Sequence, residues 1–291
     1  GTYTLLMEAF DSASSPQTKG FSLSKTGEVP PPTLEGQPLT LGATVSGAIA
    51  AAGEVDDYLF TLSGAKSLYF DALSRADDRT RWSLVGPRGE EIAPRNFNRS
   101  DSADLNAPVA LDLIAGTYRL RIDRTSGTGV YVFRLLDLSE AEAIPAGEIV
   151  EATLDPGQET DVYSFEAEAG ERLLVETLDV ANAGWSVYYR LVDPLGREIR
   201  RGARLDNAQP FTASLAGTYR LLVEGRVYED SNPTSYRFRL SKPVNRVEPL
   251  TIGETISDSI PSARSTMRYT FTLDDERTLI FDSLTDESTI D

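Results

Sequence analysis

The chain repeats short phrases in a fixed order, and this repetition limits what it can fold into more than any other feature. A Tyr-x-Phe phrase begins at Tyr58, Tyr163 and Tyr269, so successive copies lie 105 and 106 residues apart. Self-similarity at a constant period is typical of tandem structural units. The sequence therefore predicts units of about 105 residues.

Two further phrases recur in the same order relative to Tyr-x-Phe. A Pro-x-Gly turn at 87–89 returns at 194–196, and Gly-Thr-Tyr begins at Gly1, Gly116 and Gly217. Each phrase has its own place in the copy, and the order is the same every time. Together the phrases define one repeating unit.

The unit is complete twice and incomplete at both ends. We expect β-sandwich repeats at 36–140 and 141–247. Residues 1–30 match the C-terminal hairpin of a preceding repeat plus a linker, and residues 248–291 match the N-terminal part of a further repeat. Isolated hairpins are only marginally stable in water, so we interpret the chain as a segment of a longer repetitive protein.

The local patterns predict an all-β fold. The runs at 68–73, 118–122 and 130–135 are rich in aromatic and β-branched residues with partial period-two alternation, and Gly or Pro interrupts such runs every 8 to 15 residues. This spacing favours tandem antiparallel β-sandwiches, jelly-roll-like, with one face of each sheet buried.

Composition excludes several classes of function. The chain has no Cys and no His, so catalysis by a thiol or an imidazole is excluded, and neither a nucleophile elbow nor a phosphate-binding loop is present. We predict no enzymatic activity. The net charge of −17 argues against nucleic acid, whose phosphates need a basic surface, and no apolar run is long enough for membrane insertion.

At this point the ordered phrases resemble a known family. Asp-Val-Tyr-Ser-Phe at 161–165, Asp-Pro-Leu-Gly at 193–196 and Ala-Gly-Thr-Tyr at 216–219, with Gly-x-x-x-x-Gly at 42–47, are similar to the bacterial pre-peptidase C-terminal (PPC) domain. The resemblance implies a secreted, non-catalytic jelly-roll-like sandwich, of which some members bind polysaccharide, collagen or calcium. Arg268 departs from the acidic position before Tyr-x-Phe, which places any role of that carboxylate in doubt in the last copy.

Acidic residues gather in the turn before the Tyr-x-Phe strand. They are Glu54, Asp56 and Asp57 in the first full unit and Glu159 and Asp161 in the second. Calcium takes six to eight oxygen ligands, and carboxylates on a loop can supply several of them. The turns are therefore candidate calcium sites, and a solvated acidic turn is the alternative reading.

An aromatic surface for sugars is a second candidate site. Period two places Trp82, Trp185 and Tyr189 on the same face as neighbouring apolar residues, which is typical of a core. Tyr188 lies on the opposite face beside Arg190. We therefore name Tyr188 and Arg190 as the candidate ligand surface.

The preferred interpretation is a structural or adhesive array in a large secreted or cell-surface protein, forming matrix or filaments. Sandwiches joined by Pro-rich links, which are extended and stiff, would form a semi-rigid string. Its expected partners are neighbouring repeats or copies of itself, with head-to-tail assembly, and extracellular polysaccharide or protein. The alternative is a set of accessory domains that hold a secreted hydrolase on polysaccharide or collagen.

Overall fold

The structure is a computed structural model, and it describes residues 20, 22–24, 33–74, 78–101, 105, 108–144, 147–181, 187–228 and 232–284. The chain divides into two units, Gly1–Thr33 and Leu34–Asp291, and the strands belong to the second. Most of the hairpin predicted for residues 1–30 lies outside the described residues. In the described residues, regular structure consists of strands and short 3₁₀ turns, which confirms the all-β prediction.

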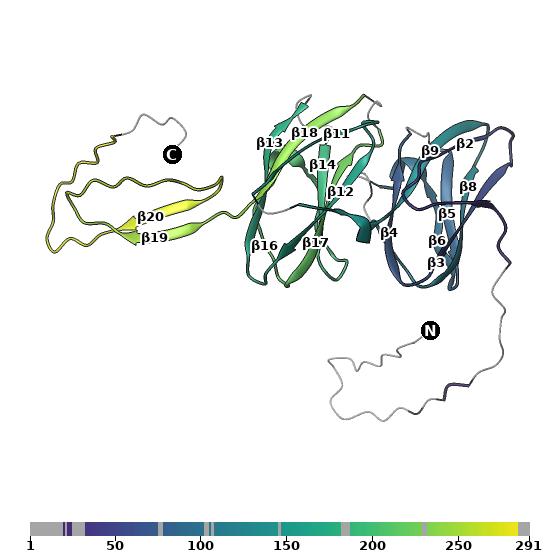
Figure 1. Cartoon of the computed structure of the whole chain (residues 1–291), viewed down its shortest axis with the longest axis horizontal. Helices are drawn as coiled ribbons and strands as arrows, with labels where there is room; N and C mark the ends of the chain where they lie inside the picture. Colours follow the sequence, from purple (N-terminus) through teal and green to yellow (C-terminus); the bar gives the residue numbers. More distant parts are fainter. Residues whose placement is uncertain are drawn as a thin grey trace. The chain divides into compact units, whose positions relative to one another are not determined.

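The first sandwich contains nine strands in two sheets. One sheet has the order β1-β3-β8-β5-β6 and the other the order β2-β9-β4-β7 (Figure 1). Short 3₁₀ turns, η1 (Phe97–Arg99) and η2 (Leu138–Glu140), follow β6 and β9. The strands are β1 (Gln37–Pro38), β2 (Val45–Ile49), β3 (Val55–Leu62), β4 (Lys66–Ala72), β5 (Thr80–Gly86), β6 (Gly89–Asn96), β7 (Ala110–Leu113), β8 (Gly116–Arg124) and β9 (Gly129–Asp137).

The second sandwich repeats this topology strand for strand. Its sheets have the orders β10-β12-β17-β14-β15 and β11-β18-β13-β16, and η4 (Leu205–Asn207) follows β15. The strands are β10 (Glu142–Ala143), β11 (Ile149–Leu154), β12 (Thr160–Ala167), β13 (Arg172–Val180), β14 (Val187–Val192), β15 (Glu198–Arg204), β16 (Phe211–Thr212), β17 (Gly217–Gly225) and β18 (Thr234–Ser241).

Both sandwiches are jelly rolls. In each, the first, third, sixth and eighth of the antiparallel strands form one sheet and the other four form the second, which is the winding of two Greek keys. The predicted jelly-roll-like sandwich is thereby confirmed. One difference is the additional edge strand, β1 or β10, which pairs in parallel with β3 or β12.

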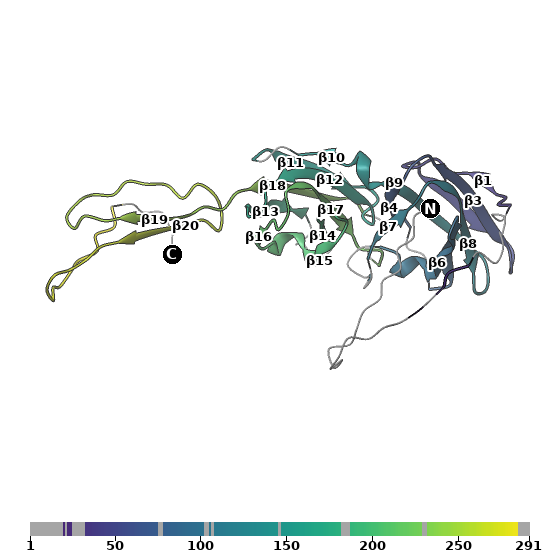
Figure 2. The same ribbon diagram turned by 90° about the horizontal axis from the view of Figure 1, so that it is seen from below.

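The same parallel pairing starts a third time. Strands β19 (Asn245–Pro249) and β20 (Thr266–Thr270) lie side by side (Figure 2) and pair Glu248 with Tyr269. The equivalent pairs are Gln37 with Tyr58 and Glu142 with Tyr163. The pairing register therefore recurs with the sequence period. Large apolar side chains of this segment are exposed, among them Phe271 at 46%.

The cores follow from period-two alternation. Tyr58 and Phe60 point inward from β3, and Trp82 stacks on Phe70 with ring centroids 4.2 Å apart. Trp82 and Tyr189 are each 1% exposed, which confirms the prediction that they belong to cores; Trp185 lies outside the described residues. Burying such aromatic side chains stabilises each sandwich by several kcal/mol, at about 25 cal/mol per Å² of apolar surface.

Candidate functional site

The outward faces of two sheets, one from each sandwich, meet in a buried contact that we call the joint. Its apolar part consists of Tyr69, Leu105, Val109 and Leu138 from the first sandwich with Val192 and Leu222 from the second, all 6% exposed or less. Strands alternate their side chains, so Tyr69 can point out of β4 while Leu68 and Phe70 fill the first core. The joint is therefore a third hydrophobic cluster, separate from both cores.

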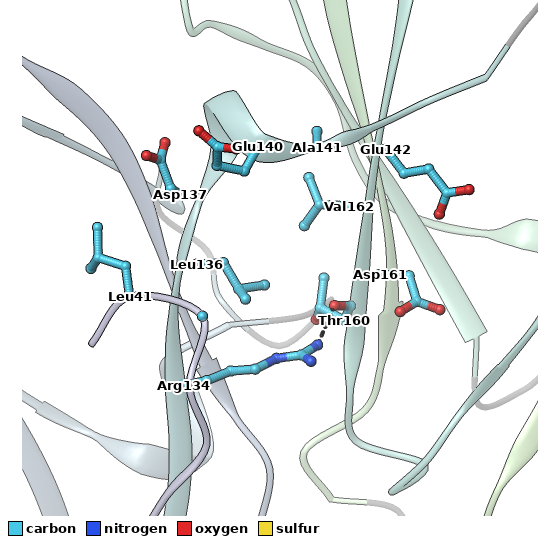
Figure 3. A pocket seen from close by; sticks show the side chains of 11 residues that line it. Leu41, Arg134, Leu136, Asp137, Glu140, Ala141, Glu142, Thr160, Asp161 and Val162 are labelled. Atoms are coloured by element: carbon cyan, nitrogen blue, oxygen red, sulfur yellow. Dashed lines mark hydrogen bonds between the residues drawn. The ribbon is translucent and has the colours of Figure 1, made fainter. Parts of the chain in front are cut away.

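All three nitrogens of the Arg134 guanidinium group have partners at the joint, one in the first sandwich and two in the second. Its Nε donates to Asp71 of β4 at 2.7 Å, and its Nη1 pairs with Glu159 of the second sandwich at 2.7 Å. Its Nη2 donates to the backbone oxygen of Thr160 at 2.7 Å (Figure 3). The Thr160 N–H donates in turn to Asp71 at 3.4 Å. One arginine thus links a carboxylate of each sandwich to the start of β12.

A second arginine, which is fully buried, belongs to the other side of the joint. Arg190 of β14 is 0% exposed and pairs with Glu224 at 3.0 Å and with Glu198 at 2.9 Å. Both carboxylates also contact the first sandwich, because Tyr69 donates to Glu224 at 3.2 Å and the Val109 N–H donates to Glu198 at 2.8 Å. Buried charges of this kind need such partners, since an unpaired buried charge is costly.

Burial perturbs the acidic groups of the joint. It raises the pKa of Asp71 to about 7, even though Arg134 opposes the shift. Burial and the negative charge of Asp71 raise the pKa of Asp101 well above its usual range. Burial also raises the pKa of Glu224, against the effect of Arg190. The desolvation of carboxylates is the common cause.

A pocket of about 360 Å³ opens beside the joint (Figure 3). Leu41, Leu136 and Val162 supply apolar walls, while Glu142 and Asp161 add carboxylates. The guanidinium of Arg134 reaches the pocket, yet each of its three nitrogens already has a protein partner. The pocket therefore has a predominantly acidic lining.

The acidic turn of the first unit is engaged in protein contacts. Glu54 accepts the N–H groups of Ala50 and Ala51 at 2.6 and 2.8 Å, which closes the turn. Asp56 accepts the Tyr131 hydroxyl at 2.5 Å, and Asp57 forms a bidentate pair with Arg121 at 2.8 Å for both bonds. The three side chains therefore serve three different partners.

The acidic turn of the second unit repeats two of these roles. Glu159 accepts the Asp155 N–H at 2.9 Å, and Asp161 accepts the Tyr236 hydroxyl at 2.7 Å. The Tyr236 hydroxyl also lies 2.6 Å from that of Tyr163, as Tyr131 lies 2.7 Å from Tyr58 in the first unit. Within the described ranges, no three acidic residues gather as a group that could hold a metal ion. Calcium binding stays a prediction.

The tyrosine pairs explain why an acid precedes Tyr-x-Phe, and sequence reasoning missed them. Tyr131 and Tyr236 lie 105 residues apart in a second Tyr-x-Phe phrase, one per unit. That recurrence was the available signal. Burial of the paired hydroxyls raises the pKa of Tyr163 to about 12 and of Tyr236 further still.

The candidate ligand surface needs correction. Arg190 was predicted to be exposed, and this was wrong, because the outward face that carries it is covered in the joint. Tyr188 is half-buried, and Arg226 lies over its ring at 5.6 Å from the centroid. The two residues therefore do not form one exposed surface: Arg190 lies in the joint, and Tyr188 is partly covered by Arg226.

A smaller contact of the same kind recurs on the sheet β11-β18-β13-β16 of the second sandwich. Glu176 and Arg239 occupy the positions of Asp71 and Arg134 and pair at 2.7 Å. The backbone of Ala263 lies near Glu176 and contributes to lowering its pKa, and the nearby Arg172 Nη1 donates to the Arg264 oxygen at 3.4 Å. The turn that precedes β20 thus contacts this ion pair as the turn before β12 contacts the first.

Among the comparisons with known proteins, the search of solved structures finds similar chains. No family model and no curated protein matches the chain. Among solved structures, the chain is similar to the pre-peptidase C-terminal domain of a collagenase from Bacillus anthracis, with 22% identity and a TM-score of 0.29 over 35% of this chain and 94% of that domain. It is also similar to the CUB1-EGF-CUB2 domains of human MASP-1/3, with 9% identity, a TM-score of 0.22, and 68% and 99% coverage. The rat MASP-1 domains give 8% identity, a TM-score of 0.20, and 67% and 97% coverage. At such scores the likenesses carry no argument about function.

In the described part of the chain, no helical segment has the length and apolarity that crossing a bilayer requires.

Proposed function

We propose that this chain is a non-catalytic part of an extracellular structural array, in which jelly rolls are coupled through buried joints. The observation that carries the proposal is the recurrence of the joint. The ion pair on β4 and β9 is hydrogen-bonded to the turn before β12, and its equivalent on β13 and β18 lies beside the turn before β20. Units that contact only their neighbours through one repeated interface are suited to spanning distance.

The composition of the joint supports coupling rather than loose tethering. Interfaces between domains of one chain are commonly polar and permit relative motion. Here an apolar cluster and two arginine networks lie between the sandwiches, and several of their hydrogen bonds need a fixed register. A shift of a few ångströms would leave Glu198, Thr160 and Arg134 with lost partners, which is costly for buried polar groups.

The test replaces Leu222 of the joint, and Val162 that packs against it, by the charges that the first sandwich carries at the equivalent positions. Val162→Asp with Leu222→Arg copies the Asp57–Arg121 pair. We expect the variant to lose the protection of the Val109 amide from hydrogen exchange and to scatter X-rays as a more extended, variable particle. Thr153→Asp with Ser235→Arg, on an exposed edge pair, is the matched control. If the joint variant matched the control, the coupling role would be refuted.

Accessory substrate binding is the second candidate, and the pocket beside the joint favours it. Its carboxylates and apolar walls suit hydroxyl-rich or basic ligands. A pull-down of the chain on chitin, cellulose and collagen would test this function. Retention that Asp161→Asn and Glu142→Gln abolish would support an accessory domain of a secreted hydrolase over a scaffold.

Calcium binding and self-association are two further proposals for this chain. The acidic turns motivate calcium, and the repeat phrases at both ends motivate head-to-tail assembly. Thermal unfolding in calcium and in chelator tests the first, where a stabilisation removed by Asp57→Asn would support a metal site. Sedimentation of the chain at increasing concentration tests the second, and a monomer throughout would refute it.

A further inference from the structure

The joint contains more buried acid than buried base. Asp71 and Glu224 are 0% exposed and Asp101 is 1% exposed, and each has one carboxylate oxygen without a hydrogen-bond partner. The bases that face them are fully buried Arg190 and the partly buried Arg134 and Arg95. A buried carboxylate with an unsatisfied oxygen is destabilised in its ionised form.

The neighbours of Asp71 do not remove this excess. Arg134 from β9 pairs with Asp71, but the same guanidinium also pairs with Glu159 from the turn before β12. Asp101, which follows η1, accepts the Ala72 N–H at 2.5 Å and adds a further negative charge near Asp71. Arg134 thus pairs with two carboxylates, and the cations near Asp101 are Arg190 and Arg95.

The other side of the joint is similar. Arg190 from β14 faces Glu224 from β17 and Glu198 from β15. Tyr69 from β4 donates to Glu224, and its hydroxyl also lies 3.1 Å from that of Thr160. Burial and the surrounding carboxylates raise the pKa of Tyr69 well above its usual range, so it remains a neutral donor.

We propose that the joint takes up protons as the surroundings become acidic, and that this uptake tightens the contact between the two sandwiches. The inference rests on the proposed coupling function and adds its regulation. A proton from the solvent binds the Asp71 carboxylate, and Arg134 keeps Glu159 as its counter-ion. The array would then be stiffer in acid than at neutral pH.

The direction follows from linkage. A carboxyl group whose pKa is raised in the closed joint binds a proton there at a pH where the opened, solvated group does not. Closing is therefore favoured as the pH falls from about 7 toward the ordinary value of 3.8. Between pH 7.5 and 5.5, one such group increases the closing constant on the order of tenfold.

The second, smaller joint supplies an internal control. Arg239 holds the pKa of Glu176 below its usual range, and Glu176 is 13% exposed rather than fully buried. Glu176 therefore stays ionised throughout this pH window. Its variant Glu176→Gln should leave the pH response of the first joint unchanged.

The experiment measures hydrogen exchange of the Val109 amide, whose acceptor Glu198 lies across the joint. In the full chain, protection corrected for intrinsic exchange should rise on the order of tenfold from pH 7.5 to 5.5. Asp71→Asn should remove most of this rise, and Glu176→Gln should retain it. A wild-type protection that does not change with pH, or an Asp71→Asn response equal to wild type, would overturn the proposal.

A direct titration keeps the proposal testable if Asp71→Asn does not fold. Carbon-13 chemical shifts of the aspartate carboxyls in the wild-type chain report their protonation. A midpoint for Asp71 near neutral pH supports the proposal, and one below pH 5 overturns it. Strong protection of Val109 at both pH values would leave the coupling function standing while refuting its regulation.

Discussion

Replacing Arg190 by methionine tests how much the buried ion network stabilises the second sandwich. The substitution removes the positive charge that faces Glu224 at 3.0 Å and Glu198 at 2.9 Å. The unbranched methionine side chain keeps most of the packing volume of the arginine. Glu224 is 0% exposed and Glu198 is nearly buried, so water cannot replace the lost partner. Breaking a buried pair on one side costs about 3–5 kcal/mol, and we expect a loss of this size.

A double variant separates the cost of unpaired charge from lost packing. Arg190→Met with Glu224→Leu removes both fully buried charges, and Glu198 keeps Arg201 and the Val109 N–H as partners. Replacing a buried pair by apolar side chains of similar volume is often neutral or stabilising. We therefore expect the double variant to regain most of the stability that the single variant loses.

The assay is unfolding in urea at pH 7.5, followed by circular dichroism and by amide exchange in β14 and β17. Arg239→Met is the matched control, because its pair with Glu176 is 35% and 13% exposed and should be worth at most about 1 kcal/mol. Two results would refute the reasoning. One is a loss below about 1 kcal/mol for Arg190→Met, and the other is a double variant less stable than the single one.

Three further substitutions test the repeated architecture. Tyr236→Phe removes the donor to Asp161 and the contact with Tyr163, and should destabilise the second sandwich by about 2 kcal/mol in thermal unfolding; no effect would mean that water replaces the hydroxyl. Trp82→Ala should cost about 3–5 kcal/mol, because the indole is 1% exposed and stacked, and a tolerated change would contradict its place in the core. Gly225→Ala should lower the melting temperature, since a Cβ there would lie 1.9 Å from the Gly157 oxygen; an unchanged melting temperature would show that β17 can shift.

Repetition made the fold predictable from the sequence. Tyr58, Tyr163 and Tyr269 mark the strands β3, β12 and β20, and each takes part in the same parallel pairing. Period two likewise separates Trp82 in the first core from its solvent-side neighbours. Such patterns report the local alternation of a strand, and alternation is what places side chains in or out of a sandwich core.

The candidate site was less predictable, because alternation does not say what covers an outward face. Arg190 was correctly placed opposite Tyr189 on β14, yet its face is buried by a second sandwich. A comparison of the two copies contained a signal. Val162 and Leu222 replace Asp57 and Arg121 at equivalent positions, and apolar residues on an outward face indicate a contact.

The acidic turns show a different limit of sequence reasoning. A carboxylate before a strand can bind an ion, close its own turn or accept a buried hydroxyl, and the three uses have the same local sequence. Asp56 and Asp161 accept hydroxyls from tyrosines 75 residues away along the chain. Such partners are fixed only when the eighth strand of the jelly roll packs against the second.

The differences between the two copies also determine the order of units. The face of the second sandwich that enters the joint carries Val162, Leu222 and buried Arg190, whereas the equivalent face of the first carries the Asp57–Arg121 pair, which is 19% and 36% exposed. Docking that charged face onto Tyr69 and Asp71 of another copy would desolvate an ion pair without an apolar gain. An ion pair that would lose water without an apolar gain disfavours this partner. The face with Tyr69 and Asp71 therefore favours docking of the second sandwich, and it disfavours docking of another copy of the first sandwich.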